Sequence, residues 1–186
     1  MQIRSIRGSN VTAAEHNLVL KFTKQCLREL CKKKYEVYFH GKPVTYREAL
    51  TNCVVKTKYR SQASNGGAAR ICIDMQRYRS KLSSFKEYAS FADDPVIGNI
   101  PDCNDRELLL KCLVAHEVAH HVQFRYGPHT RWLKNNYQKP HGDGFKNIYR
   151  ELRRTLVNPK IKPMSAPIKC VKKEERVPFL EAYFKF

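Results

Sequence analysis

The sequence has no long apolar run. Its densest apolar stretch, Leu108-Leu109-Leu110, is interrupted at once by Lys111, whereas a membrane span needs about 20 predominantly apolar residues. The first ten residues, MQIRSIRGSN, carry positive charge but no apolar segment of the kind that secretory signals contain. We therefore expect no membrane association and no secretion, and a cytoplasmic, nucleoid or nuclear location.

Closely spaced cysteine pairs are also missing. The seven cysteines are odd in number and scattered, and no C-x-x-C pair occurs among them. Disulfide frameworks and cysteine-type zinc modules are built on such pairs. The sequence thus predicts reduced thiols in an intracellular compartment and no separate zinc ribbon.

Acidic residues are scarce. The chain has 17 Asp and Glu residues against 35 Lys and Arg residues, which gives a net charge of +18. A charge this high concentrates polyanions near the protein, nucleic acid above all. A solubilising surface or an acidic protein partner is the alternative, but several basic clusters contain aromatic residues, which favours nucleic acid. The candidate nucleic-acid contacts are Lys32, Lys33, Lys34, Lys56, Lys58, Arg60, Arg77 and Arg79. The pattern leaves open DNA against RNA and single against double strands.

The length of 186 residues suits one domain with an appended tail. We expect a domain over residues 1–157. Residues 158–186 are rich in proline and lysine, which predicts a C-terminal tail that is extended or wrapped on the surface.

Three helices are predicted. Thr12-Ala13-Ala14-Glu15 is a capping box that opens the first helix, which runs into the lysines from Lys32. Asn104 or Asp105 can cap a second helix over about 106–126, which Gly127-Pro128 ends. A third helix starts near Asp143, because apolar residues then recur at spacings of three or four.

Three strands are predicted at 35–39, 53–59 and 70–75, from β-branched, aromatic or alternating residues. A turn at Asn65-Gly66-Gly67 precedes the last strand. We expect the three strands to form a small antiparallel meander.

The segment His116-Glu117-Val118-Ala119-His120-His121 carries the strongest functional signal. His116 and His120 are four residues apart, so they share one face of the second helix and can bind one ion. H-E-x-x-H is the pattern of a zinc site in which the glutamate is the general base. His121 points about 100° away from His120 and is therefore the spare histidine.

Catalytic zinc usually has three protein ligands and an open position for water. The candidates for the third ligand are His129, His141, Asp143 and Glu151. His141 is favoured, because it opens the glycine-containing turn His141-Gly142-Asp143-Gly144-Phe145 just before the third helix. For the group that stabilises the oxyanion, the sequence offers Tyr137, Tyr149 and Arg150 without selecting among them.

H-E-x-x-H followed by H-G-x-x-F and a basic helix resembles the SprT-like metalloproteases, which include the Spartan-type proteases of DNA–protein crosslinks. The resemblance covers roughly residues 12–157 and rests on the motifs His116 to His120 and His141 to Phe145. It implies an α+β, zincin-like domain with a small sheet packed on the active-site helix. It also implies one zinc ion held by His116, His120 and His141, with Glu117 as the catalytic base, and cleavage of DNA-bound or crosslinked proteins.

Two other functions remain open. The first is a nucleic-acid-binding structural protein with a stabilising zinc site and no protease activity; Cys112, four residues before His116, would then be a candidate fourth ligand. The second is a zinc hydrolase that acts on something other than peptides, which H-E-x-x-H alone does not exclude.

Overall fold

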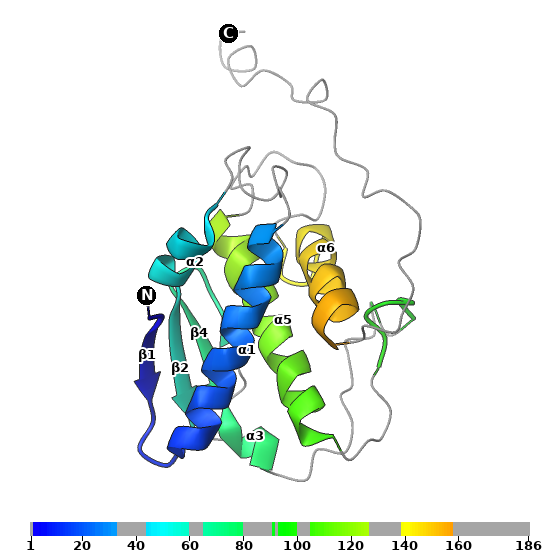
Figure 1. Cartoon of the computed structure of the whole chain (residues 1–186). Coiled ribbons are helices and arrows are strands. Elements are labelled where there is room, and N and C mark those ends of the chain that lie inside the picture. Colours follow the sequence, from blue (N-terminus) through cyan, green and yellow to red (C-terminus); the bar gives the residue numbers. More distant parts are fainter. Residues whose placement is uncertain are drawn as a thin grey trace, which may run out of the picture.

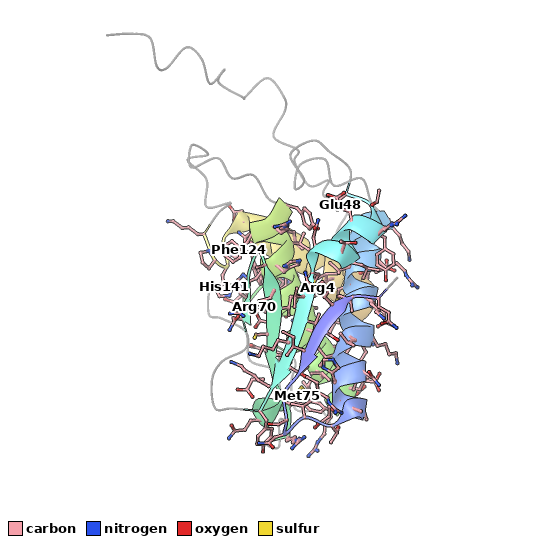
Figure 2. The ribbon with its side chains drawn as sticks, turned by 90° about the vertical axis from the view of Figure 1, so that its left-hand side faces the viewer. Arg4, Glu48, Arg70, Met75, Phe124 and His141 are labelled. Carbon is pink, nitrogen blue, oxygen red and sulfur yellow. The ribbon has the colours of Figure 1, made fainter. Side chains whose placement is uncertain are left out.

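The computed structural model describes residues 2–32, 44–59, 65–79, 91, 93–99, 105–126 and 139–157. The fold has two layers, a four-stranded sheet and a set of helices packed on one of its faces (Figure 1). The other face of the sheet is turned toward the viewer in Figure 2, and no described helix covers it. The predicted strand at 35–39 and the tail at 158–186 lie outside the described residues.

The sheet has the strand order β1-β2-β4-β3. Its strands are β1 (Arg4–Arg7), β2 (Val54–Lys58), β3 (Asn65–Gly66) and β4 (Arg70–Asp74). β1 pairs with β2 and β2 pairs with β4 in parallel, and only β3 pairs with β4 in antiparallel fashion.

The prediction of an antiparallel meander is therefore wrong, although the α+β class is confirmed. Two helices, α1 (Ala13–Lys32) and α2 (Tyr46–Asn52), connect β1 to β2 and return the chain to the same end of the sheet, which makes the pair parallel. β3 lies next to β4 at the edge of the sheet and runs in the opposite direction to it. The chain therefore reverses twice between β2 and β4, and these two strands are parallel as well. The sequence analysis placed strands near β2 and β4 but did not consider these connections.

Local signals explain how the helices begin. In α1 the predicted capping box is present, since the Glu15 N–H donates to Thr12 Oγ1 at 3.2 Å and the Thr12 N–H donates to Glu15 Oε2 at 2.9 Å. The helix α2 was not predicted from the sequence, although Thr45 and Glu48 mark its start in the same way. The Glu48 N–H donates to Thr45 Oγ1 at 3.2 Å. The strand β1 was also missed, because all four of its residues are exposed and show no alternation.

The helix α5 (Arg106–Tyr126) is the centre of the domain, with the bounds that the sequence predicted. The side chain of Asp105 caps it by accepting a hydrogen bond from the Leu108 N–H at 2.9 Å. Residues 112–123 are buried without interruption, because α1, the sheet and α6 (Asp143–Leu152) pack around the helix. No helix among the described residues is both long and apolar enough to cross a membrane.

After α6 the chain continues into a π-helical turn, η2 (Arg153–Val157), which also contacts α5. A short helix, α3 (Met75–Arg79), follows β4. The helices α5 and α6 lie side by side (Figure 1). The residues of the H-E-x-x-H motif thus lie on a buried helix between the sheet and α6.

Candidate metal centre

His116 and His120 lie one helical turn apart on the buried helix α5, and the centroids of their rings are 5.0 Å apart. Both side chains are more than nine-tenths buried. A buried imidazole must find a partner for its polar nitrogens or lose solvation free energy. The α-helix thus presents two nitrogen donors of the H-E-x-x-H motif to the same point.

His141 reaches this point from a tight turn, Lys139-Pro140-His141-Gly142, in which the Gly142 N–H donates to the Lys139 carbonyl oxygen at 2.9 Å. His141 has a φ of 63°, in the left-handed region that favours glycine and asparagine. The amide of Gln123 on α5 donates to the same Lys139 carbonyl at 3.1 Å and so fixes the turn to the helix. The backbone tolerates an unfavourable conformation here, and this conformation directs the imidazole toward α5.

The three histidines form a group that could hold a metal ion. The Nε2 atom of His141 is 3.2 Å from Nε2 of His116 and 2.9 Å from Nε2 of His120. Nitrogen atoms that bind one tetrahedral zinc ion at 2.0–2.1 Å are about 3.3 Å apart. The observed separations agree with this value to within a few tenths of an ångström, so the donor set fits such an ion.

An aromatic side chain supports all three imidazoles. The ring centroid of Phe145, which is fully buried, lies 4.9 Å from that of His116, 4.2 Å from that of His120 and 5.0 Å from that of His141. Phe145 stands on the first turn of α6, four residues after His141. The H-G-x-x-F spacing therefore brings the third histidine and its hydrophobic support to the same place.

Burial keeps the imidazoles of His120 and His141 uncharged at neutral pH. Burial, together with the charge of His141, lowers the pKa of His120 to about 3, and burial also lowers the pKa of His141. A metal ion binds the neutral imidazole and competes with protons for its lone pair. The site is thus ready to bind a cation at neutral pH without first releasing protons from His120 or His141.

Glu117 is buried beside the histidines but does not belong to the group that could ligate the ion. Burial raises the pKa of its carboxyl to about 8, although a hydrogen bond from the backbone of Gly66 opposes the shift. A carboxylate whose pKa is raised is a stronger base than an exposed carboxylate, so it takes up a proton more readily. This is the property that a general base of the H-E-x-x-H type requires.

The strand β3 is locked against α5 through the two glycines of the predicted turn. A Cβ atom at Gly66 would lie 2.0 Å from the backbone carbonyl oxygen of Glu117, so only glycine allows this approach. The imidazole of His121 donates from Nδ1 to the carbonyl oxygen of Gly67 at 2.7 Å. Contacts at Glu117 and at His121, one helical turn apart on α5, therefore hold β3 and with it the environment of Glu117.

His121 thus has a structural role that was not predicted from the sequence. It is fully buried, as a packed spare histidine would be, but its hydrogen bond positions β3. As the helical wheel predicted, His121 does not belong to the group of histidines that could hold an ion. It could not identify the partner, because Gly67 is 54 residues away in the sequence.

The structure also places the other candidates for the third ligand. Asp143 is exposed at the start of α6, and the carboxylate of Glu151 accepts hydrogen bonds from Arg154 at 2.7 and 2.9 Å. His129 lies outside the described residues. The sulfur of Cys112, the candidate fourth ligand, lies 3.1 Å from the hydroxyl of Tyr149 and outside the histidine group.

Two of the candidate oxyanion groups have other partners. The hydroxyl of Tyr149 is also hydrogen-bonded by Arg153 at 3.3 Å, and Tyr149 is fully buried. Arg150 forms an ion pair with Asp94, donating from Nε at 2.7 Å and from Nη2 at 2.5 Å. The third candidate, Tyr137, lies outside the described residues.

The predicted nucleic-acid contacts do not form one patch among the described residues. Lys32, at the end of α1, pairs with Glu29, whereas Arg79 pairs at 2.6 Å with Glu15 at the start of that helix. Glu15 and Lys32 are 17 residues apart, which corresponds to about 25 Å along a helix. Lys32 and Arg79 are therefore too far apart to contact the same nucleotide of a bound nucleic acid.

Lys56 and Lys58 lie on the sheet face that no described helix covers, since their neighbours Val55 and Thr57 are the buried residues of β2. Lys33, Lys34 and Arg60 are outside the described residues, as is the side chain of Arg77. Whether any of these residues contacts nucleic acid stays a prediction.

Comparisons of the chain with protein-family models, with curated proteins and with solved structures found no significant match.

Proposed function

We propose that this protein is a zinc-dependent metallopeptidase, similar to the SprT-like proteases, that acts on proteins bound or crosslinked to DNA. The observation that carries the proposal is the convergence of the Nε2 atoms of His116, His120 and His141 beside the buried carboxyl of Glu117. Three imidazoles are the ligand set of a catalytic zinc site, which keeps one position open. A structural zinc site is normally closed by four ligands, and Cys112 does not supply the fourth.

The residues of the chain divide the chemistry between them. The three histidines would hold the zinc ion, which when bound lowers the pKa of a water molecule and polarises the scissile carbonyl. Glu117 accepts the proton of the attacking water and later donates it to the leaving amine. Gly66 and His121 fix the position of β3 beside this glutamate.

The proposed DNA association rests on charge. The net charge of +18 attracts a polyanion over long range and increases the rate at which it is met. A protease with such a surface can select its substrates by their location, because it cuts proteins that are bound to the same nucleic acid.

The experiment is a cleavage assay on the zinc-loaded protein with a basic DNA-binding protein as substrate, with and without single-stranded DNA. Fragments, including those of the protease itself, are identified by mass spectrometry. Glu117→Gln should retain zinc and lose at least about 100-fold in cleavage rate, because the general base is lost. Glu107→Gln is the matched control, since this glutamate is exposed in the first turn of the same helix.

Cleavage that is equal in the two variants would contradict the proposal. If zinc-loaded protein binds DNA but produces no fragments, a nucleic-acid-binding structural protein becomes the better description. If DNA leaves cleavage unchanged and does not bind at moderate salt, the peptidase stands and the DNA association falls.

A further inference from the structure

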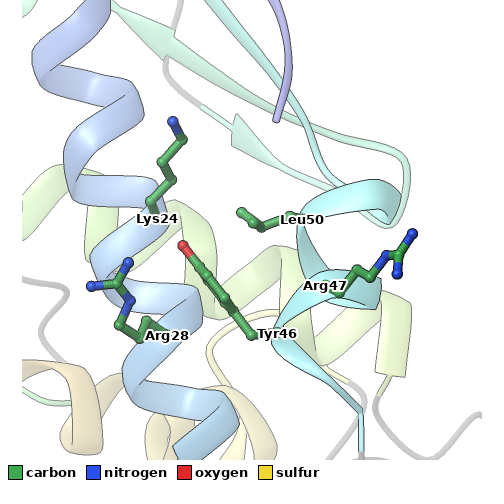
Figure 3. Close-up of a pocket in the computed structure, with 5 residues that line it drawn as sticks. All are labelled: Lys24, Arg28, Tyr46, Arg47 and Leu50. Atoms are coloured by element: carbon green, nitrogen blue, oxygen red, sulfur yellow. The ribbon is translucent and has the colours of Figure 1, made fainter. Parts of the chain in front are cut away.

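A groove between α1 and α2 contains a concentration of positive charge. It has a volume of about 540 Å³ and is lined by Lys24 and Arg28 of α1 and by Tyr46, Arg47 and Leu50 of α2 (Figure 3). A second hollow of about 470 Å³ adjoins it along α1 and shares Lys24 and Arg28 with it. None of these residues belongs to the metal centre or to the basic clusters that contain aromatic residues.

The groove is uniformly positive. Lys24 and Arg28 stand four residues apart on one face of α1, and Lys21 extends the row by one further turn. Arg47 of α2 also lines the hollow, although its side chain extends away from α1 in Figure 3. No acidic side chain is among the residues that line either hollow.

The acidic residues nearest in sequence to the groove residues either pair with other cations or do not line the groove. Glu29 pairs with Lys32, and Glu107 reaches only Lys21, at 3.7 Å. Glu48 is exposed on α2 but does not line the groove. Within the described residues, no salt bridge neutralises Lys24, Arg28 or Arg47, so the three cations that line the hollow have no counter-charge.

An aromatic ring forms one wall of the groove. Figure 3 shows the side chain of Tyr46 between those of Lys24 and Arg28 on one side and Leu50 and Arg47 on the other. The guanidinium carbon of Arg28 lies 5.3 Å from the centroid of the Tyr46 ring. Cations alone are enough to bind a simple anion. The Tyr46 ring beside them adds a surface on which a planar group can stack.

We propose that this groove binds a single-stranded segment of nucleic acid, with Lys24, Arg28 and Arg47 on its phosphates and Tyr46 against a base. Cations that follow a backbone together with an aromatic platform are the elements of single-strand binding. From Lys21 to Arg28 the row rises about 10 Å along the helix, a length that several phosphates can match. The inference rests on the proposed function for its choice of DNA as partner and names the surface that would hold it.

The groove lies away from the metal centre. In Figure 2, His141 stands on one side of the molecule and Glu48 of α2 on the other. A strand in the groove would therefore not cover the metal centre. This arrangement suits a peptidase that is recruited by DNA but does not cut it.

The test is the binding of a fluorescein-labelled 15-nucleotide oligo-dT, measured by anisotropy over a series of salt concentrations. The variant Lys24→Gln/Arg28→Gln/Arg47→Gln should bind at least about 10-fold more weakly, and the slope of log K against log salt should fall by about 2, since each phosphate contact on a single strand contributes about 0.7. The control Arg4→Gln/Lys56→Gln/Arg70→Gln removes the same charge from the uncovered sheet face. It should keep affinity within about 3-fold.

A further variant tests the aromatic wall. Tyr46→Leu retains an apolar side chain, so it should weaken oligo-dT binding about 10-fold and duplex binding much less. Circular dichroism checks that each variant is folded. Peptidase activity without DNA should be the same in all of them, because none of these residues belongs to the metal centre.

Equal losses in the groove variant and the sheet variant would overturn the inference, because net charge alone would then explain binding. A larger loss in the sheet variant would move the binding surface to the sheet and overturn it as well. If wild-type protein binds no DNA, the inference fails together with the DNA part of the proposed function. If wild-type binds and the groove variant binds equally, only the inference fails.

Discussion

Around His116 and His120 nearly every side chain is buried and fixed by its neighbours, whereas in the groove between α1 and α2 the guanidinium groups of Arg28 and Arg47 are exposed to solvent. The first region is built from uncharged donors and the second from charges. Burial lowers the pKa of His120 and raises the pKa of Glu117. The two regions thus suit different ligands, a metal ion that needs lone pairs and a polyanion that needs positive charge.

Because the metal centre is part of the core, metal binding should change the stability of the protein. At free zinc 1,000-fold above the dissociation constant, binding to the folded state alone adds about 4 kcal/mol to the free energy of unfolding. Chelation should remove this gain, and thermal denaturation with and without chelator would measure it. The oligo-dT affinity of the groove should change little in the same experiment.

His141→Asn sharpens this prediction. Asparagine accepts the left-handed conformation that His141 adopts at φ 63°, so the metal-free variant should stay within about 1 kcal/mol of wild-type. Its stabilisation by zinc should nevertheless be lost. Asp143→Asn, in the same loop but exposed, should respond to zinc like wild-type; a loss there would show that the loop, rather than the ligand, governs binding.

The close contact of Gly66 with α5 offers the next largest effect. Gly66→Ala places a methyl group against the backbone of Glu117 and should destabilise the protein by about 1–3 kcal/mol, as overpacked sites do. Gly67→Ala is the matched control, because its Cβ meets only the Arg70 carbonyl, at 3.9 Å. It should change stability by less than about 0.5 kcal/mol. Equal effects in urea denaturation would contradict the proposed packing of β3 on the helix.

The smallest effect is expected at the surface, where Arg79 holds Glu15. The hydrogen bond from Arg79 is the largest cause that lowers the pKa of Glu15 to about 2, against a usual value of 4.5. Since the folded-state pKa is depressed, the pair stabilises the protein above pH 4.5 and loses this effect as the pH falls toward 2. Solvent screening limits the contribution of Glu15 to about 0.5 kcal/mol.

Glu15→Gln should therefore lower the free energy of unfolding slightly at pH 7 and leave it unchanged near pH 2. Urea denaturation at both pH values measures the difference. A deficit that persists at pH 2 would mean that packing, rather than charge, is lost. If Arg79 served nucleic acid instead of the fold, Glu15→Gln would strengthen oligo-dT binding.

Much of the local structure could be predicted from the sequence. The capping box at Thr12, the bounds of α5 and the start of α6 at Asp143 depend on neighbouring residues and were confirmed. The face shared by His116 and His120 follows from helical geometry in the same way. The strand β1 and the direction of the strands were not predicted, because they depend on pairing between distant segments.

Local sequence patterns were enough to predict a basic chain with an H-E-x-x-H helix, two histidines on one face and a further histidine before a third helix. Tertiary structure decided which distant groups meet that helix: the Nε2 atom of His141, the ring of Phe145 and the backbone of Gly66 and Gly67. It also placed Arg47 of α2 at the same hollow as Lys24 and Arg28 of α1. The physical reason is that periodicity and capping act over a few residues. Convergence of side chains depends instead on how α5 is packed between the sheet, α1 and α6.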